Sequence, residues 1–186
     1  MTRLKKKFNE TVVPALMKKF SYRNVHQVPC IKRIFLNVGV GDPSTNPGLL
    51  EDALKTITSL TGQKAVPTRA KTAISNFKIK VGMPIGVRVS LSGDRMWEFF
   101  DRFVNLTIPR IRDFRGLSRK SMDGNGNFTV GLKEQIIFHE ISQDKIKKMH
   151  GMDVTIVTSA KSDKEGLALL EELGMPFRKE KEKGGN

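Results

Sequence analysis

Several segments of this chain alternate apolar and polar residues with a period of two, the pattern of a β-strand that buries only one face. The clearest of them is Ile31–Val40, whose apolar face comprises Ile34, Leu36, Val38 and Val40. Its opposite face comprises Arg33, Phe35 and Asn37. The pattern recurs at 87–91, 127–132 and 153–160, and a further strand at 64–70 is expected at a sheet edge, because Pro67 has no ladder donor. We therefore predict a sheet with one face under helices and one polar face.

Four segments have helical features. An apolar residue recurs at every fourth position near the start of the chain, at Leu4, Phe8, Val12, Leu16 and Phe20. This spacing predicts a helix, and Pro14 is expected to kink it. The segment 46–62 begins with an Asn-Pro pair and ends at a glycine. Asp94–Phe103 is expected to start with its aspartate as the cap, and 162–174 opens with a capping box. We therefore expect helices to cover the apolar face of the sheet.

The size of the chain favours one folded unit. With 186 residues we expect a single domain over 1–178 and a flexible charged tail over 179–186, where no apolar residue occurs. The single cysteine, Cys30, excludes an internal disulfide and suits a reducing cytoplasm. No apolar run approaches the about 20 residues that cross a bilayer, so no membrane partner is expected.

The charge of the chain is strongly positive and unevenly distributed. The net charge is +14, and the segment Ala53–Gly93 contains no carboxylate at all. Residues 1–133 hold 24 basic and 9 acidic side chains, whereas 134–186 hold 9 and 10. Like charges repel in a compact state, so such an imbalance indicates a polyanionic partner, with nucleic acid as the leading candidate. A merely basic, well-solvated surface is the alternative.

Two further segments are unusual. Thr72–Gly86 has no clear period and three glycines, and we interpret it as a long, protruding basic loop, a kind that is usually functional or disordered. In Ile108–Leu117, arginines alternate with apolar residues, a composition typical of protein or RNA contact surfaces; the arginines are Arg110, Arg112 and Arg115. A loop tethered to the core by Ile111 and Phe114 is the simpler and compatible interpretation.

Catalytic and metal motifs are weak here. Asp123–Glu134 mimics a calcium loop, but Phe128 stands where glycine is needed, so a hairpin turn is expected instead. His139–Glu140 lacks the second histidine of a zinc motif, and Gly39–Gly41 lacks the rest of a phosphate loop. We therefore predict no catalysis, no metal and no cofactor.

Longer motifs carry a specific resemblance. The segments are Ile74–Lys78, Gly82–Gly86, Pro109–Gly116, Gly131–Gln135, Gly151–Asp153 and Gly174–Phe177. In this order they resemble bacterial large-subunit ribosomal protein five, over essentially the whole chain. The resemblance implies an α+β fold: an antiparallel sheet with helices packed on one face and a polar, RNA-facing opposite face. It also implies a non-catalytic protein of the central protuberance that binds 5S rRNA and lies near 23S rRNA and neighbouring large-subunit proteins. Such a protein would contact peptidyl-site tRNA and bridge to a protein of the small-subunit head.

The expected contact residues form three groups. For 5S rRNA, the resemblance implies Asn37, Gln63 and Ser90, and the polarity of the strand faces adds Arg33 and Arg88. The tRNA-facing loop would present Lys71, Asn76, Lys78 and Lys80. The intersubunit contact would use Arg110, Arg112 and Arg115. A free-standing RNA-binding regulator or RNA chaperone using the same basic sheet is the alternative function.

Overall fold

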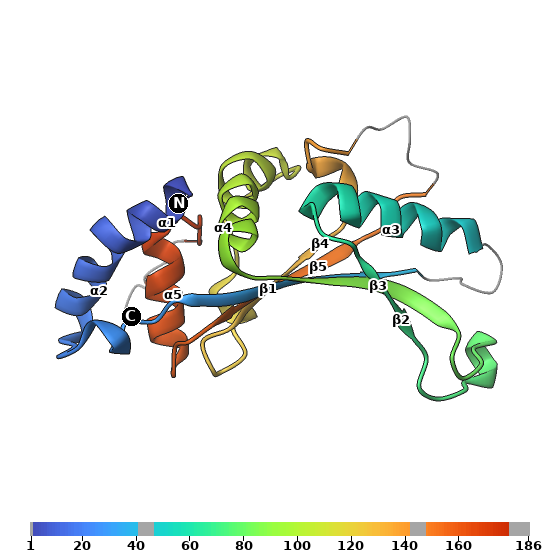
Figure 1. Ribbon diagram of the computed structural model, residues 1–186, viewed down its shortest axis with the longest axis horizontal. Coiled ribbons are helices and arrows are strands. Elements are labelled where there is room, and N and C mark those ends of the chain that lie inside the picture. Colours follow the sequence, from blue (N-terminus) through green and yellow to red (C-terminus); the bar gives the residue numbers. More distant parts are fainter. Residues whose placement is uncertain (1, 41–46, 142–147, 179–186) are drawn as a thin grey trace, which may run out of the picture.

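The computed structural model describes residues 2–40, 47–141 and 148–178. They form a five-stranded sheet in the order β2-β3-β1-β5-β4 (Figure 1). Its strands are β1 (Ile31–Gly39), β2 (Val66–Arg69), β3 (Pro84–Leu91), β4 (Phe128–Leu132) and β5 (Met152–Thr158). Every neighbouring pair is antiparallel, which confirms the predicted fold class. The strand that contains Pro67 lies at an edge, as predicted, because proline cannot donate to a second neighbour.

Helices cover one face of the sheet and one of its ends. In Figure 1, α3 (Pro47–Thr61) and α4 (Gly93–Arg102) lie on the same side of the sheet. The helices α1 (Arg3–Lys7), α2 (Val13–Phe20) and α5 (Asp163–Glu172) gather at the end where β1 begins. Short 3-10 helices occur at 25–27, 75–77, 108–110, 119–121 and 135–137.

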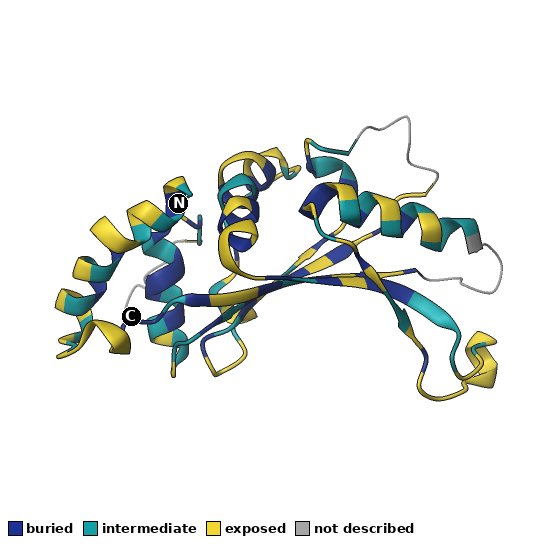
Figure 2. Ribbon diagram, viewed as in Figure 1, coloured by how far each residue is buried: buried dark blue, intermediate teal, exposed yellow. Residues whose placement is uncertain are grey.

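The core lies between the sheet and these helices. Ile34 of β1 pairs with Leu91 and Ile156, and Ile156 pairs with Phe128, so one fully buried apolar row crosses four strands. The helices add a large aromatic and aliphatic set to this row: Ile57, Leu60, Met96, Trp97, Phe99, Phe100 and Phe103. Figure 2 shows buried positions alternating with exposed ones along the strands. This alternation confirms the face assignments made from the period of two.

Two prolines follow π-helical turns. Phe8–Val12 forms such a turn just before Pro14, and Phe103–Thr107 forms one shortly before Pro109. Proline has no N–H and collides with the carbonyl four residues earlier, and one wider turn accommodates both problems without ending the helix. The irregularity expected at Pro14 therefore takes the form of a π-helical turn.

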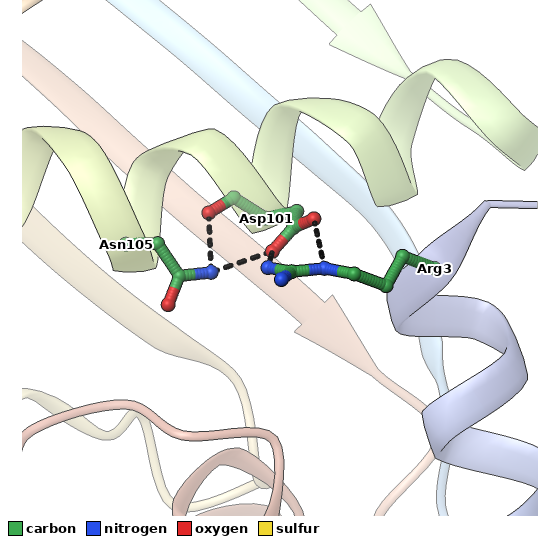
Figure 3. A network of polar contacts seen from close by, with 3 residues as sticks. All are labelled: Arg3, Asp101 and Asn105. Carbon is green, nitrogen blue, oxygen red and sulfur yellow. Dashed lines mark hydrogen bonds and ion pairs between the residues drawn. The ribbon is translucent and has the colours of Figure 1, made fainter.

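Polar contacts tie the N-terminal helices to α4 and α5. The Arg3 guanidinium donates to both carboxylate oxygens of Asp101 (3.3 and 2.8 Å), and Asn105 donates to Asp101 as well (Figure 3). The Tyr22 hydroxyl donates to Glu165 at 2.7 Å, and burial together with this bond raises the pKa of Tyr22. These contacts join segments that lie about a hundred residues or more apart along the chain.

Some element boundaries differ from the predictions. The basic loop ends before Gly86, because β3 already starts at Pro84 and pairs there with Arg69. Gly86 of β3 allows the close approach of β1 on the other side, since a Cβ at that position would lie 2.7 Å from the Val38 carbonyl oxygen. Asp94 is not the cap of α4: Ser92 precedes the helix as N-cap, and Asp94 lies in its first turn.

Other helix termini are closer to expectation. The predicted capping box of α5 differs from the standard pattern: Ser162 makes no side-chain cap bond, and Glu165 accepts from the N–H of Lys161, one residue before the N-cap. Gly174 ends this helix with φ +101, and Gly62 follows α3 with φ +64, both as predicted. The expected cap Asn46 and the tail 179–186 lie outside the described residues.

Candidate nucleic-acid interface

The side of the sheet turned away from α3 and α4 carries polar side chains from four strands, and we call it the polar sheet face. Strand pairing sets these side chains in rows. One row, from β3 to β4, runs Arg88, Asn37, Asp153 and Gly131. The next row runs Ser90, Phe35, Thr155 and Thr129. Side chains directly opposite each other on antiparallel strands lie within about 5.5 Å at Cβ, so each row presents a contiguous set of groups.

The structure brings most of the predicted 5S rRNA residues together. Asn37 lies directly beside Arg88, and Ser90 belongs to the next row on the same strand. Arg33 is farther away, opposite Val157 at the other end of β1, about 13 Å along the strand from Asn37. Within the described ranges, the side chains of these four residues make no hydrogen bond or ion pair. They are therefore available to an external ligand.

Gln63 has a different position from the other predicted residues. It follows α3, and its Nε2 donates to the backbone carbonyl of Ser90 at 3.0 Å. The bond satisfies that carbonyl beyond the point where β2 ceases to pair with β3. Gln63 thus lies at the margin of the polar sheet face, and part of its hydrogen-bonding capacity serves the fold.

The predicted basic loop is the extended end of the β2–β3 hairpin, and we call residues 70–83 the hairpin tip. The Ala70 N–H donates to the Met83 carbonyl at 2.8 Å, and Ile74 and Ile79 exchange two backbone bonds of 3.0 and 3.1 Å. Lys78 adopts a left-handed conformation with φ 53 just after a 3-10 turn. The tip therefore has internal structure that the absence of a period did not predict.

Most side chains of the hairpin tip are exposed. All four predicted tRNA-facing residues are exposed: Lys71, Asn76, Lys78 and Lys80. Two apolar side chains near them were not singled out from the sequence: Phe77 is 71% exposed and Val81 is 68% exposed. An exposed aromatic ring between lysines is the composition of a base-stacking platform. An aromatic residue inside an acid-free segment was the signal that could have identified Phe77.

We call residues 108–117 the arginine segment, and it lies at the sheet edge opposite the hairpin tip. Arg110, Arg112 and Arg115 are exposed while Ile111 and Phe114 are half-buried against the core, as predicted. Residues 111–118 form one wall of a pocket of about 410 Å³ whose other wall includes residues 130–134, at the edge strand β4. The segment returns to the C-terminal part of the fold through a bond from the Leu117 N–H to the Pro176 carbonyl at 2.8 Å.

The segment that mimics a calcium loop is a turn. The Asp123 carboxylate accepts from the Asn127 amide at 2.7 Å and from the backbone N–H groups of Asn125 and Asn127 at 2.9 and 3.0 Å. These bonds lower the pKa of Asp123, that with the Asn127 side chain most strongly. Its oxygens are thus occupied by the turn, in agreement with the predicted hairpin connection before β4.

Comparison with known proteins agrees with this architecture. The family model described as Ribosomal protein L5 matches residues 24–80, and a second model, for the C-terminus of the same ribosomal family, matches residues 84–177. This chain belongs to the ribosomal L5 family. It is similar to the "Large ribosomal subunit protein uL5" of Prochlorococcus marinus strain NATL1A, with 57% identity over 95% of this chain and 98% of that protein. The uL5 protein of Thermoanaerobacter sp. strain X514 is 54% identical over 96% of this chain and 100% of its own length.

Membership of the L5 family sets the general role of the chain. It is a structural, non-enzymatic constituent of the large ribosomal subunit, it acts in translation, and its partners are ribosomal RNA and ribosomal proteins. As a ribosomal protein it is associated with ribosomes in the cytoplasm. Separately, the described helices include none with the length and hydrophobicity needed to span a membrane. The resemblance noted from the sequence motifs is thereby confirmed.

Proposed function

We propose that this protein binds 5S rRNA through the polar sheet face and helps attach it to 23S rRNA and neighbouring proteins in the central protuberance of the large subunit. The observation that carries the proposal is the row Arg88–Asn37, continued by Ser90 on the same strand, in which polar side chains lie side by side with no partner among the described residues. Amide, hydroxyl and guanidinium groups on an open sheet suit RNA, whose minor groove and unpaired bases expose both donors and acceptors. The net charge of +14 supplies the attraction to phosphate.

The test is direct binding of 5S rRNA to the full chain. Asn37→Ala is expected to weaken binding by about 1–3 kcal/mol, because it leaves a desolvated RNA group without its partner. Ser90→Ala should weaken it in the same direction. Asn9→Ala is the matched control, since Asn9 is an exposed asparagine on the N-terminal helical segment. If both sheet variants bind 5S rRNA as tightly as the wild type, this face is not the binding site.

A second measurement separates a ribosomal constituent from a free-standing regulator or RNA chaperone. A constituent should remain with large subunits after a high-salt wash, whereas a regulator held by exposed charge alone should dissociate, because salt weakens phosphate contacts. Family membership favours the first outcome.

The hairpin tip is proposed to contact peptidyl-site tRNA. The exposed lysines at 71, 78 and 80 can neutralise phosphates, Asn76 can hydrogen-bond, and the exposed Phe77 ring can pack against a base or a ribose. Figure 1 shows the tip extending away from the helical end of the molecule, so it can reach a ligand that does not touch the polar sheet face.

The arginine segment is proposed to meet a protein of the small-subunit head when the subunits join. Arg110, Arg112 and Arg115 project outward from a segment whose apolar residues anchor it to the core. Guanidinium groups form planar, paired hydrogen bonds with carboxylates and tolerate partial desolvation, which suits a protein interface. The adjacent pocket beside β4 adds a concave surface to this contact.

A further inference from the structure

An acidic residue lies in the middle of the polar sheet face. Asp153 of β5 is exposed, with Asn37 opposite it on one side and Gly131 on the other. Within the described ranges its carboxylate has neither a hydrogen bond nor an ion pair. Many other carboxylates of the fold are paired, as in Arg3–Asp101, Lys5–Asp94, Arg102–Glu140 and Arg119–Glu171. Other exposed carboxylates, such as Glu98 on α4, are also unpaired among the described residues, but Asp153 differs from them in lying on the surface proposed to attract RNA.

The chemistry of a carboxylate limits what it can contact in RNA. An ionised carboxylate only accepts hydrogen bonds, and it repels phosphate. Its possible RNA partners are thus donor groups: base amino and imino groups or the ribose 2′-hydroxyl. An open sheet is too broad for the deep, narrow major groove of an RNA helix, but it can approach the wide, shallow minor groove. There the exocyclic donor of a base is the 2-amino group of guanine.

The neighbours of Asp153 favour guanine over an isolated hydroxyl. Asn37 lies directly opposite and offers an amide donor beside the carboxylate acceptor. The minor-groove edge of guanine presents the reverse pair, the N3 acceptor beside the 2-amino donor. Gly131 has no side chain and leaves the outer flank of the carboxylate open: a Cβ there would lie 3.4 Å from Asp153 Oδ1.

We propose that Asp153 and Asn37 together recognise the minor-groove edge of a guanine in the RNA bound on the polar sheet face. Asp153 accepts from the 2-amino group, and the Asn37 amide donates to N3. Adenine lacks the 2-amino group and would leave the carboxylate desolvated without a donor, so the pair discriminates against it. The inference rests on the proposed function, because it requires 5S rRNA on this face.

The sign of one mutational effect separates this role from simple electrostatics. Removing a negative charge from a surface that contacts phosphates should strengthen RNA binding. If Asp153 accepts a hydrogen bond from guanine, the isosteric Asp153→Asn should instead weaken binding about tenfold. Glu98→Gln is the matched control: Glu98 is an exposed carboxylate on α4, on the other side of the sheet, and its loss changes the net charge equally.

The experiment combines these variants with altered RNA. In vitro transcribed 5S rRNA carrying sparse inosine in place of guanosine is partitioned into bound and unbound fractions, and the positions of inosine are mapped in each. Inosine lacks the 2-amino group but keeps N3. With the wild type, inosine at one guanosine should deplete the bound fraction. With Asp153→Asn that depletion should become clearly smaller, because the amide oxygen of asparagine accepts a hydrogen bond less strongly than a carboxylate. Glu98→Gln should keep it.

The outcomes distinguish the two levels of the proposal. If the wild type does not bind 5S rRNA, the proposed function fails. If the wild type binds but Asp153→Asn binds equally or more tightly, or shows the same inosine pattern, the guanine inference is wrong while the proposed function stands. The same partition can be made with 5S rRNA that carries sparse 2′-deoxy substitutions. If a 2′-deoxy position, but no inosine position, depletes the bound fraction with the wild type and not with Asp153→Asn, the carboxylate contacts a ribose hydroxyl and the inference is likewise overturned. Thermal melting of each variant checks that the fold is unchanged.

Discussion

The polar sheet face and the hairpin tip are both proposed to contact RNA, but different interactions hold their residues in place. Residues of the face come from strands far apart in the chain, such as Asn37 and Asp153, and their spacing is set by strand pairing over a buried apolar row. The tip is held by backbone bonds between residues near in sequence, such as Ile74 and Ile79, and the side chains of Ile74, Phe77 and Val81 are exposed. Positioning of the face therefore depends on the core, whereas the tip can change without affecting it.

The largest expected difference concerns two phenylalanines. Phe128 of β4 is fully buried in the core. Phe128→Ala should lower the free energy of unfolding by about 3–5 kcal/mol, because it removes buried apolar surface and leaves a cavity. Phe77→Ala at the tip should change it by less than about 0.5 kcal/mol, since that ring is mostly in water. Urea denaturation of both variants measures the contrast. Equal destabilisation by the two changes would show that the tip packs more tightly than its exposure indicates.

Removing the hairpin tip should separate its function from that of the face. Residues 71–82 can be replaced by an Asn-Gly turn, because Ala70 and Met83 are already joined by a backbone hydrogen bond. We expect the free energy of unfolding to change by less than about 1 kcal/mol, because a shorter loop costs less closure entropy. Affinity for 5S rRNA should be retained and tRNA-dependent translation impaired. A large loss of 5S rRNA affinity would place the tip in the RNA site.

The arginine segment should behave as an intermediate case. Phe114 is only half-buried, so Phe114→Ala should cost about 1–2 kcal/mol of stability, less than at a fully buried ring. Thermal or urea unfolding checks this value. A loss as large as that of Phe128→Ala would mean that the segment belongs to the core rather than covering it.

Charge reversal in the same segment should affect only assembly. Arg110→Glu and Arg112→Glu are expected to leave folding and 5S rRNA binding intact, because both side chains are exposed and neither belongs to the strands that carry Arg88, Asn37 and Ser90. Subunit association should fall, most clearly at low magnesium, in sucrose-gradient profiles. If these proteins lose 5S rRNA binding while subunits join normally, the bridge proposal is wrong.

The smallest expected effect is on salt dependence. Arg88→Ala should reduce the slope of log affinity for 5S rRNA against log salt by about one unit, the loss of a single phosphate contact. Lys78→Ala, the same type of charge removal at the tip, should leave this slope unchanged. A reduction by Lys78→Ala equal to that by Arg88→Ala would mean that both regions contact the same RNA.

Much of this protein follows from the sequence alone, because periodicity, proline and glycine act locally. The apolar face of β1, the edge position of the strand with Pro67 and the glycines that end α3 and α5 were all predicted in this way. The segment motifs also identified the family. What the sequence left open depends on contacts between distant residues.

Only the tertiary structure determined which polar residues share a row. Nothing near position 37 in the sequence indicates that Asp153 lies opposite Asn37, or that residues 111–118 face β4 across a pocket. Gln63 was predicted as an RNA ligand, yet its amide also supports Ser90. Strand order and register are set by the best total burial of apolar rows under the helices, a property of the whole chain rather than of any segment, and they place these polar groups together.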